Sequence, residues 1–191
     1  MAIQLQNLSL GIGRFQRGPI SFEFPDRGLF LLVGPNGSGK TTLLRTLVHR
    51  LPPLSGAVHG LKFPVGVSGA ESLLMREWTV GRNWEFLSAL RRNETTSFAF
   101  PEEMRAHRDI PSHHLSQGTR RKVELSMLMA LGFPTLLLDE PLAPLDQASR
   151  VQYAAALQKY AEEHLVILST HESDTNLWPS SVKKFSMETL S

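Results

Sequence analysis

The 191-residue sequence contains no cysteine. This absence excludes disulfide bonds, a thiolate nucleophile and thiolate metal ligands, and it is compatible with a reducing compartment. The chain also has no apolar run near the roughly 20 residues that a membrane-spanning helix needs. Its first residues lack the basic and then apolar pattern of a signal peptide. We therefore expect a cytoplasmic protein.

Neither sign of charge dominates. There are 20 lysines and arginines against 18 acidic residues, which gives a formal net charge of +2. This mildly basic balance favours an acidic ligand or an anionic surface, but it falls short of a nucleic-acid footprint, so no nucleic-acid partner is expected. With 41% hydrophobic residues, a chain of this length can bury one good core, and we expect a single domain over residues 1–191.

The most informative stretch is an apolar strand that runs through a glycine-rich turn into a helix. The turn reads Gly34, Pro35, Asn36, Gly37, Ser38, Gly39, Lys40, Thr41 and Thr42. A glycine, four residues and then Gly-Lys-Thr form a phosphate cradle, in which backbone N–H groups and a helix N-terminus surround an anion. Lys40 would reach the terminal phosphates, and the Thr41 hydroxyl would lie on a magnesium ion that bridges them. The alternative is a flexible Gly-Ser-Gly turn without a ligand, which the strand and helix context argues against.

The apolar pattern around this cradle predicts an α/β fold. Alternation at residues 3–5 and 20–25 predicts half-buried antiparallel strands, joined by a loop at residues 11–15. Three continuous apolar runs, at residues 29–33, 136–138 and 165–168, predict the buried strands of a parallel sheet. Brief strands and turns are expected between residues 55 and 67. Helices are expected at residues 40–48, 79–92, from 101 onward, 117–131 and 147–163, with a polar loop at residues 91–97.

Helix surfaces are also predicted from the pattern. The helix at residues 147–163 would bury Val151, Ala154, Ala155 and Leu157. The basic pair at residues 91–92 and the basic run at residues 120–122 are most simply explained as solvated helix faces.

Polar side chains follow the second and third apolar strands. Ligands of parallel sheets bind beyond the carboxyl ends of the strands, so Asp139, Glu140 and His171 should converge with the cradle on one nucleotide. Asp139 can hold the magnesium shell, Glu140 can polarise an attacking water, and His171 can contact the γ-phosphate. The alternatives are exposed acids at a strand end and a histidine that faces solvent.

Two further segments complete a recognisable arrangement. Leu115-Ser116-Gln117-Gly118-Thr119, here the signature segment, lies shortly before the strand that ends in Asp139-Glu140. The segment 143–146 and His171 follow in order. With the cradle, this order closely resembles the nucleotide-binding ATPase subunit of ATP-binding cassette (ABC) transporters.

The resemblance implies a fold: a P-loop NTPase core with a parallel sheet, an N-terminal antiparallel β subdomain and a shortened α-helical subdomain. Residues 1–70 and 132–191 would form the ATP-binding core, and residues 71–131 the short helical subdomain with the signature segment. The cofactors implied are ATP and Mg²⁺.

The same resemblance implies site roles. Lys40 would bind the β- and γ-phosphates, and Thr41 and Asp139 would serve magnesium. Glu140 would be the catalytic base and His171 the γ-phosphate sensor.

Further roles follow from pairing, because in this family two subunits pair head to tail. Ser116 and Gly118 of one subunit would close over the ATP of the other, and Asp146 would couple the two. Phe15 occupies the place of an aromatic ring that stacks on adenine. Ser116 and Asp146 could equally be helix N-caps, and Phe15 could be a core residue.

Some residues depart from the family pattern. Gln117 replaces a usual glycine and Thr119 a usual glutamine, and the expected loop glutamine is missing near residues 67–71, where Glu71 could substitute. The span from residue 71 to residue 115 is short, like that of the compact ATPases of haem-exporter systems, which favours export.

The sequence therefore predicts an ATP-hydrolysing subunit of a separately encoded membrane transporter. It would act as a homodimer, bound peripherally to an integral membrane subunit on the inner face of the cell membrane. Two alternatives remain: a soluble ABC ATPase without a transport role, and a degenerate cassette that binds ATP but hydrolyses it weakly.

Overall fold

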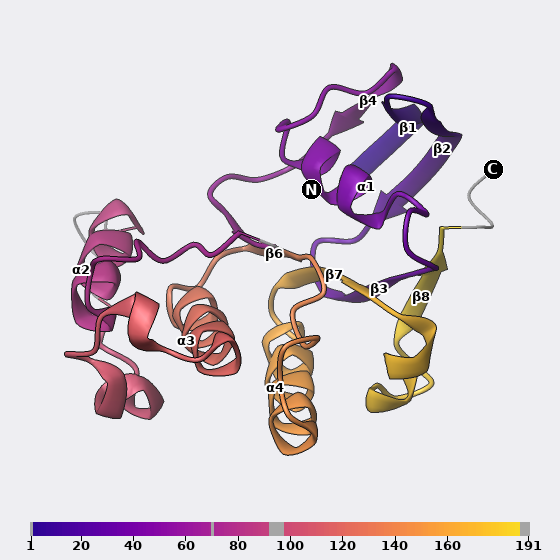
Figure 1. Cartoon of the computed structure of the whole chain (residues 1–191). Coiled ribbons are helices and arrows are strands. Elements are labelled where there is room, and N and C mark those ends of the chain that lie inside the picture. The colour runs from indigo at the N-terminus through magenta and orange to yellow at the C-terminus, as the bar shows by residue number, and fades with distance from the viewer. Residues whose placement is uncertain (1, 70, 92–97, 188–191) are drawn as a thin grey trace.

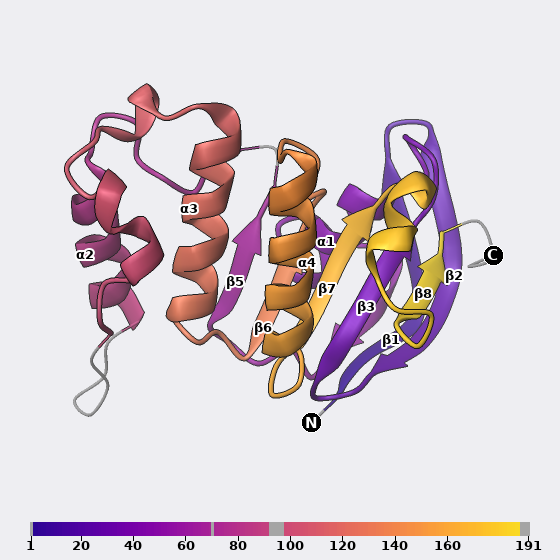
Figure 2. The same ribbon diagram turned by 90° about the horizontal axis from the view of Figure 1, so that it is seen from below.

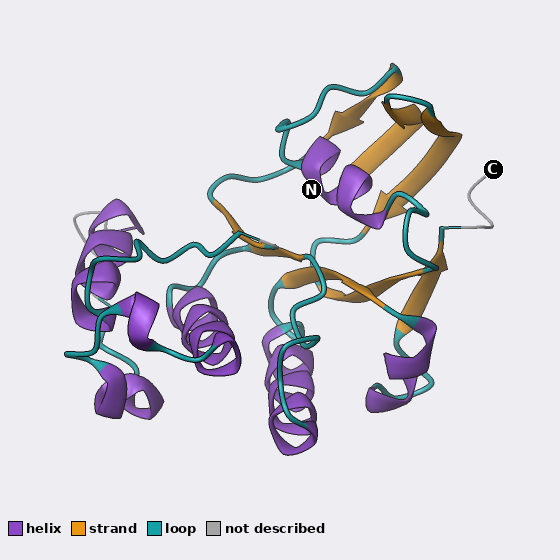
Figure 3. Cartoon of the chain, viewed as in Figure 1, coloured by secondary structure: helices purple, strands orange, loops and turns teal. Residues whose placement is uncertain are grey.

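The chain folds into two β-sheets with helices around them, as a computed structural model that describes residues 2–69, 71–91 and 98–187 shows (Figure 3). Apart from Arg91, the loop expected at residues 91–97 lies outside the described residues. Among the described residues, no helix is long and apolar enough to cross a membrane.

The central sheet is parallel and has the strand order β5-β6-β7-β3-β8. Its strands are β3 (Gly28–Val33), β5 (Val65–Ser68), β6 (Thr135–Leu138), β7 (Leu165–Thr170) and β8 (Lys183–Ser186). The three apolar runs form its centre, since β6, β7 and β3 are consecutive neighbours. Periodicity alone did not place β5 and β8 in this sheet, because the two edge strands are only four residues long.

The second sheet is antiparallel, with the order β2-β1-β4. It contains β1 (Ile3–Ile12), β2 (Phe15–Phe24) and β4 (Ser55–His59). The loop expected at residues 11–15 is wrong, because Ile12 pairs with Phe15 and only residues 13 and 14 make the turn. Gly13, with a φ of 58°, supplies the left-handed conformation that so tight a turn requires.

In the described part of the chain, four α-helices and three short 3₁₀ helices connect the strands. The α-helices are α1 (Lys40–Leu47), α2 (Val80–Arg91), α3 (Gln117–Ala130) and α4 (Gln147–Tyr160), and the 3₁₀ helices are η1 (Glu102–His107), η2 (Ser112–His114) and η3 (Glu172–Leu177). The helix expected from residue 101 is therefore a 3₁₀ helix of six residues.

The buried face of α4 differs from the expectation. Val151 is 55% exposed, because Arg150 takes the inward position in the first turn and donates hydrogen bonds to the carbonyls of Leu145 and Ala143. Ala155 is also exposed. Tyr153, which the pattern did not assign to the core, is buried with Ala154 and Leu157.

The two faces of the parallel sheet bury different elements. Leu29, Leu31 and Val33 of β3 pack in one cluster with residues of α3 and α4, which lie together below the sheet in Figure 1. Phe30 and Leu32 pack in a second cluster with α1 and the antiparallel sheet. This separation follows from the two-residue period of a strand, whose successive side chains point to opposite faces.

A third apolar cluster holds residues 74–91 and 98–131 together. It joins Trp84 of α2, Met104 of η1 and Val123 of α3, and Figure 2 shows these helices grouped at one end of the molecule, beyond β5. Trp84 is a core residue at 4% exposure. Trp78 is half-buried, and its ring lies under the Arg82 guanidinium at 4.4 Å.

Candidate functional site

The phosphate cradle, Gly34–Thr42, connects β3 to α1 in the structure. Gly39 is the N-cap of α1 and has a φ of 100°, a conformation that disfavours any side chain. A Cβ atom at this position would also lie only 2.5 Å from the Phe15 ring. Glycine is therefore required here both by the turn and by the close approach of Phe15.

Lys40 is the first residue of α1, and its side chain lies in the cradle. Its side chain is buried, and Nζ donates hydrogen bonds to the carbonyl oxygens of Gly34 at 2.7 Å and Pro35 at 3.1 Å. These bonds use two of the three N–H groups of the ammonium. The third, with the N-terminal N–H groups of α1, can bind phosphate oxygens.

Thr41, in the first turn of α1, meets Asp139, which directly follows the carboxyl end of β6. The Thr41 hydroxyl donates to Oδ2 of Asp139 at 2.7 Å, across 98 residues of sequence. A hydroxyl and a carboxylate side by side are hard oxygen donors of the kind that Mg²⁺ prefers. The donor set of this pair therefore fits a magnesium ion.

Ser169, at the end of β7, was not singled out from the sequence. Its hydroxyl donates to Oδ1 of Asp139 at 2.6 Å and accepts the backbone N–H of Glu140 at 2.8 Å. The side chain is fully buried. A signal was present, because Ser169 is a polar residue at the end of a buried apolar strand, two positions before His171.

Glu140 and His171 form the next pair. His171 Nε2 lies 3.2 Å from Oε1 of Glu140, and each side chain is about one-third exposed, at 37% and 36%. Glu140 has a φ of 47°, which is a strained conformation for a residue with a side chain. The hydrogen bond from its N–H to Ser169 stabilises this backbone conformation. The carboxylate contacts the histidine and is also open to solvent.

A hollow of about 330 Å³ lies beside the cradle. It is lined by Ile12, Phe15, Glu140 and residues 36–42. Phe15 is half-buried and also packs against the cluster around α1. The sequence left open whether Phe15 is a core residue or lies at the nucleotide site, and its ring in fact contacts both the core and the hollow.

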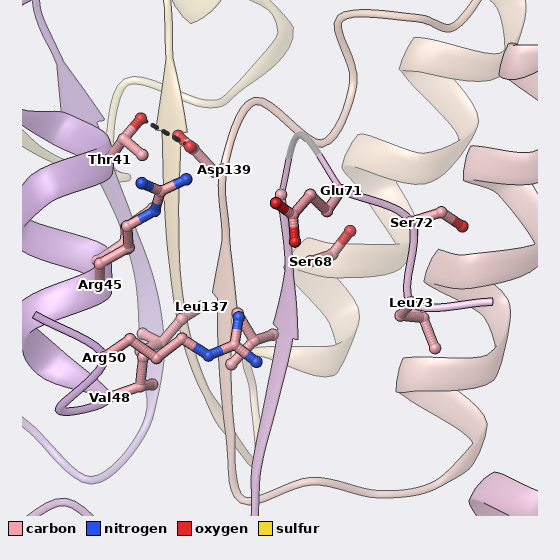
Figure 4. A pocket seen from close by; sticks show the side chains of 13 residues that line it. Thr41, Arg45, Val48, Arg50, Ser68, Glu71, Ser72, Leu73, Leu137 and Asp139 are labelled. Atoms are coloured by element: carbon pink, nitrogen blue, oxygen red, sulfur yellow. Dashed lines mark hydrogen bonds between the residues drawn. The ribbon is translucent and has the colours of Figure 1, made fainter. Parts of the chain in front are cut away.

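A second hollow, of about 180 Å³, opens between α1 and the segment after β5. Figure 4 shows Thr41 and Asp139 at one end and Glu71 on the opposite wall, with Arg45 and Arg50 projecting from the α1 side. Glu71 occupies the loop where a glutamine was expected, and it shares this hollow with the candidate metal pair.

The signature segment lies at the start of α3. The Ser116 hydroxyl accepts the N–H of Thr119 at 3.1 Å and so caps this helix. The Thr119 hydroxyl also lies 2.8 Å from that of Ser116. A Cβ atom on Gly118 would approach the Pro144 carbonyl oxygen to 3.1 Å. The signature segment and residues 143–146 are therefore neighbours.

Asp146 is the N-cap of α4. Its carboxylate accepts the backbone N–H of Ser149 at 2.9 Å and the Lys122 ammonium at 3.2 Å. The hydrogen bond from this N–H, helped by the Ser149 hydroxyl and Lys122, lowers the pKa of Asp146 to about 2. Within the described part of the chain, Ser116, Gly118 and Asp146 do not line either hollow beside the cradle.

Most of the basic residues predicted to be solvated instead contact other groups of the protein. Arg92, part of the same prediction, lies outside the described residues. Arg91 donates to the carbonyls of Leu131 and Gly132 and lies over the Phe133 ring. Arg120 donates to the Ser112 carbonyl. The solvated-face prediction is wrong at these positions, because backbone carbonyls at helix and loop ends lie within reach of each guanidinium.

Arg121 also turns inward, toward the segment after β5. Three consecutive residues of a helix span about 200° of its circumference. Residues 120–122 could therefore not all share one solvated face, and this signal was present in the sequence.

The sequence also matches a known protein family. The sequence profile described as ABC transporter matches residues 18–143. The chain is similar to the cytochrome c biogenesis ATP-binding export protein CcmA of Roseobacter denitrificans, with 32% identity over 154 residues that cover 80% of this chain and 75% of that protein.

Two solved structures share the fold. A Pyrococcus furiosus ATP-binding protein assigned to the ABC transporters superimposes with a TM-score of 0.81 at 22% identity, over 100% of both chains. A bacterial ABC transporter cassette solved as a dimer superimposes with a TM-score of 0.76 at 18% identity, over 97% of this chain and 94% of that one. From its profile match, its relatives and the order of its motifs, this chain belongs to the ABC transporter family.

Proposed function

We propose that this chain is an ATP hydrolase that powers an exporter by ATP-dependent dimerisation. The observation that carries the proposal is the meeting of the cradle, the Thr41–Asp139 pair and the Glu140–His171 pair at one edge of the parallel sheet. Each pair joins residues from separate segments of the sequence. A buried core alone would not require these polar groups to converge beside a hollow.

Binding falls to the cradle and to Phe15. Lys40 and the N-terminal N–H groups of α1 hold the β- and γ-phosphates, and residues 34–42 surround them. The Phe15 ring, which lines the same hollow, stacks on adenine. Thr41 and Asp139 would hold Mg²⁺, which when bound neutralises charge on the phosphate oxygens.

Hydrolysis falls to Glu140. Its carboxylate borders the hollow and accepts a proton from a water molecule as that water attacks the γ-phosphorus, releasing ADP and phosphate. His171 holds this carboxylate through the 3.2 Å contact and can donate to a γ-phosphate oxygen. Ser169 holds the Asp139 carboxylate and the Glu140 backbone in place through its two hydrogen bonds.

The site needs a second copy of the chain. Ser116 and Gly118 lie outside the hollow of their own subunit, and Ser116 begins a helix whose N-terminus can bind an anion. Head-to-tail pairing would bring them over the ATP of the partner. A cassette of the same fold was solved as a dimer, which supports this arrangement.

The transport role rests on relatives. CcmA is named an ATP-binding export protein, and we extend this role to the present chain, bound to an integral membrane subunit at the cytoplasmic face. Recovery of the chain with a membrane protein after detergent extraction supports the role. Recovery only with soluble partners would contradict it and favour a cassette without a transport function.

The decisive experiment compares wild type with Glu140→Gln. We expect wild type to hydrolyse ATP and the variant to lose at least about 100-fold in kcat, because the general base is gone, while still binding ATP. Size-exclusion chromatography should then show an ATP-dependent dimer of the variant. Glu162→Gln, an exposed acid beyond the end of α4, is the control and should match wild type.

Equal and negligible turnover of wild type and Glu140→Gln would overturn the hydrolase proposal. It would favour the second candidate, a cassette that binds ATP but barely hydrolyses it. Two observations motivate that candidate: the Thr119 hydroxyl is engaged by Ser116, and Glu71 stands where a glutamine was expected. A strictly monomeric Glu140→Gln variant with ATP would overturn the dimer.

A further inference from the structure

A buried ion pair lies in α3, within two turns of the signature segment. Nη1 of Arg121 is 3.0 Å from Oε2 of Glu124, and the side chains are only 12% and 2% exposed. Charges at such depth are costly unless each is paired and hydrogen-bonded. The pair is therefore expected to have further partners, and those partners identify what it holds.

Among the described residues, those partners lie at the end of β5 and on the segment that follows it. The Arg121 guanidinium donates to the Ser68 hydroxyl and, at 2.7 Å, to the Gly69 carbonyl oxygen. The Ser72 hydroxyl donates to Oε1 of Glu124. We call Arg121, Glu124 and these three partners the clamp. It joins two segments that are about 50 residues apart in sequence, as the separations of 52 and 53 show.

One end of the clamp touches the strand of the candidate metal ligand. The Ser68 carbonyl accepts the backbone N–H of Asp139 at 2.8 Å. A Cβ atom on Gly69 would lie 3.7 Å from Cβ of Asp139. Ser68, Gly69 and Ser72 also line the hollow that contains Thr41 and Asp139 (Figure 4). A shift of this segment would therefore displace the strand end at Asp139.

The other end of the clamp, Arg121 and Glu124, lies on α3, the helix that begins in the signature segment. Arg121 lies five residues after Ser116, which is about 7.5 Å along one continuous helix. Ser116 caps that helix, so the signature segment and Arg121 move together. The contacts from Ser116 to Asp139 therefore run without a break through α3, Arg121 and Ser68.

We propose that Arg121 and Glu124 are positioning residues that couple the two ATP sites of the dimer. The inference rests on the dimer proposed above, in which each signature segment closes over the ATP of the other subunit. Occupation of one subunit's own metal site fixes the segment after β5. Through the clamp, this segment fixes α3, whose signature segment closes over the ATP of the other subunit. Binding of ATP at one site then favours closure at the other.

The experiment removes both charges together. In Arg121→Met/Glu124→Leu the buried pair is replaced by apolar side chains of similar volume, a change that proteins often tolerate. The ATP dependence of hydrolysis gives the Hill coefficient, which has an upper limit of 2 for two coupled sites. We expect a coefficient well above 1 for wild type and close to 1 for the double variant. Binding of a fluorescent ATP analogue to the monomer should stay within about twofold.

Arg91→Met is the matched control. It removes another partly buried arginine from the same group of helices, but the partners of Arg91 are the carbonyls of Leu131 and Gly132 rather than the segment after β5. This variant should keep the wild-type Hill coefficient. An equal loss in the control would overturn the inference, since it would show a general loosening of the helices.

Two other outcomes separate the inference from its basis. A cooperative wild type with an equally cooperative double variant overturns the inference alone, whereas a wild type with a coefficient of 1 and no ATP-dependent dimer overturns the dimer and the inference with it. If the double variant lacks a cooperative unfolding transition, Arg121→Lys decides. Lysine keeps the charge but not the forked geometry that reaches Ser68, Gly69 and Glu124 together, so the coefficient should again fall, and an unchanged value refutes the coupling.

Discussion

Replacement of Ser169 by alanine tests the reasoning about the site most directly. The Ser169 hydroxyl is fully buried and links two groups, the Asp139 carboxylate at 2.6 Å and the Glu140 N–H at 2.8 Å. Alanine removes the hydroxyl and almost no volume. The change is therefore a deletion of these two hydrogen bonds rather than a change in packing.

The expected cost follows from the two bonds. A hydrogen bond to a charged group contributes about 1.5–3 kcal/mol, and an N–H left without a partner costs about 1–3 kcal/mol. The two share one hydroxyl and do not add fully, so we expect the free energy of unfolding to fall by about 2–4 kcal/mol. In a domain of this size the unfolding midpoint should drop by roughly 5–15 °C.

Activity should fall as well. Glu140 has a left-handed backbone at φ 47°, and without Ser169 nothing else in the described structure holds its N–H. A loss of only about 1.4 kcal/mol of transition-state stabilisation lowers the rate tenfold, so we expect at least that reduction in kcat.

Ser126→Ala is the control for this prediction. Ser126 is equally buried, but its hydroxyl lies 3.0 Å from that of Tyr153, between α3 and α4 and away from both hollows. Its loss should cost about 1 kcal/mol and leave kcat unchanged. Urea unfolding and a coupled ATPase assay measure both quantities. The reasoning is refuted if Ser169→Ala is no less stable than Ser126→Ala and keeps kcat within twofold of wild type.

Three further predictions follow from the structure. The N–H of Ser149 lowers the pKa of Asp146 to about 2. The charged carboxylate should therefore stabilise the fold fully above its unfolded pKa of about 4, and this stabilisation should be lost as the pH falls through about 2. An NMR titration of Asp146 with a midpoint near 4 would contradict this prediction. Phe15→Ala should weaken ATP binding about 5- to 100-fold by loss of stacking but leave inorganic triphosphate binding unchanged, and calorimetry showing equal losses for both ligands would rule out stacking on adenine. Arg91→Met should lower the free energy of unfolding by about 1–3 kcal/mol without changing kcat, and a large loss of activity in the ATPase assay would place Arg91 in the site after all.

The local patterns of the sequence were sufficient for much of the fold. The central strands, the cradle and the starts of α1, α3 and α4 depend on residues within a few positions of one another. Apolar runs, glycine spacing and N-cap side chains are interactions of that range, so they can be read without the tertiary structure. Two of the departures were also local in origin. The turn at residues 13–14 was predicted too long, and on α4 Arg150 rather than Val151 faces inward.

The sequence by itself thus determined the fold class, the family and, apart from Ser169, the residues that meet at the edge of the sheet. Only the tertiary structure decided how those residues are held. The hydroxyl of Ser169 reaches Asp139 across 30 residues, and Arg121 reaches Gly69 across 52. A serine in a strand or an arginine on a helix does not reveal whether a partner is within hydrogen-bonding distance, because burial and pairing of polar groups are set by segments that meet only after the chain has folded.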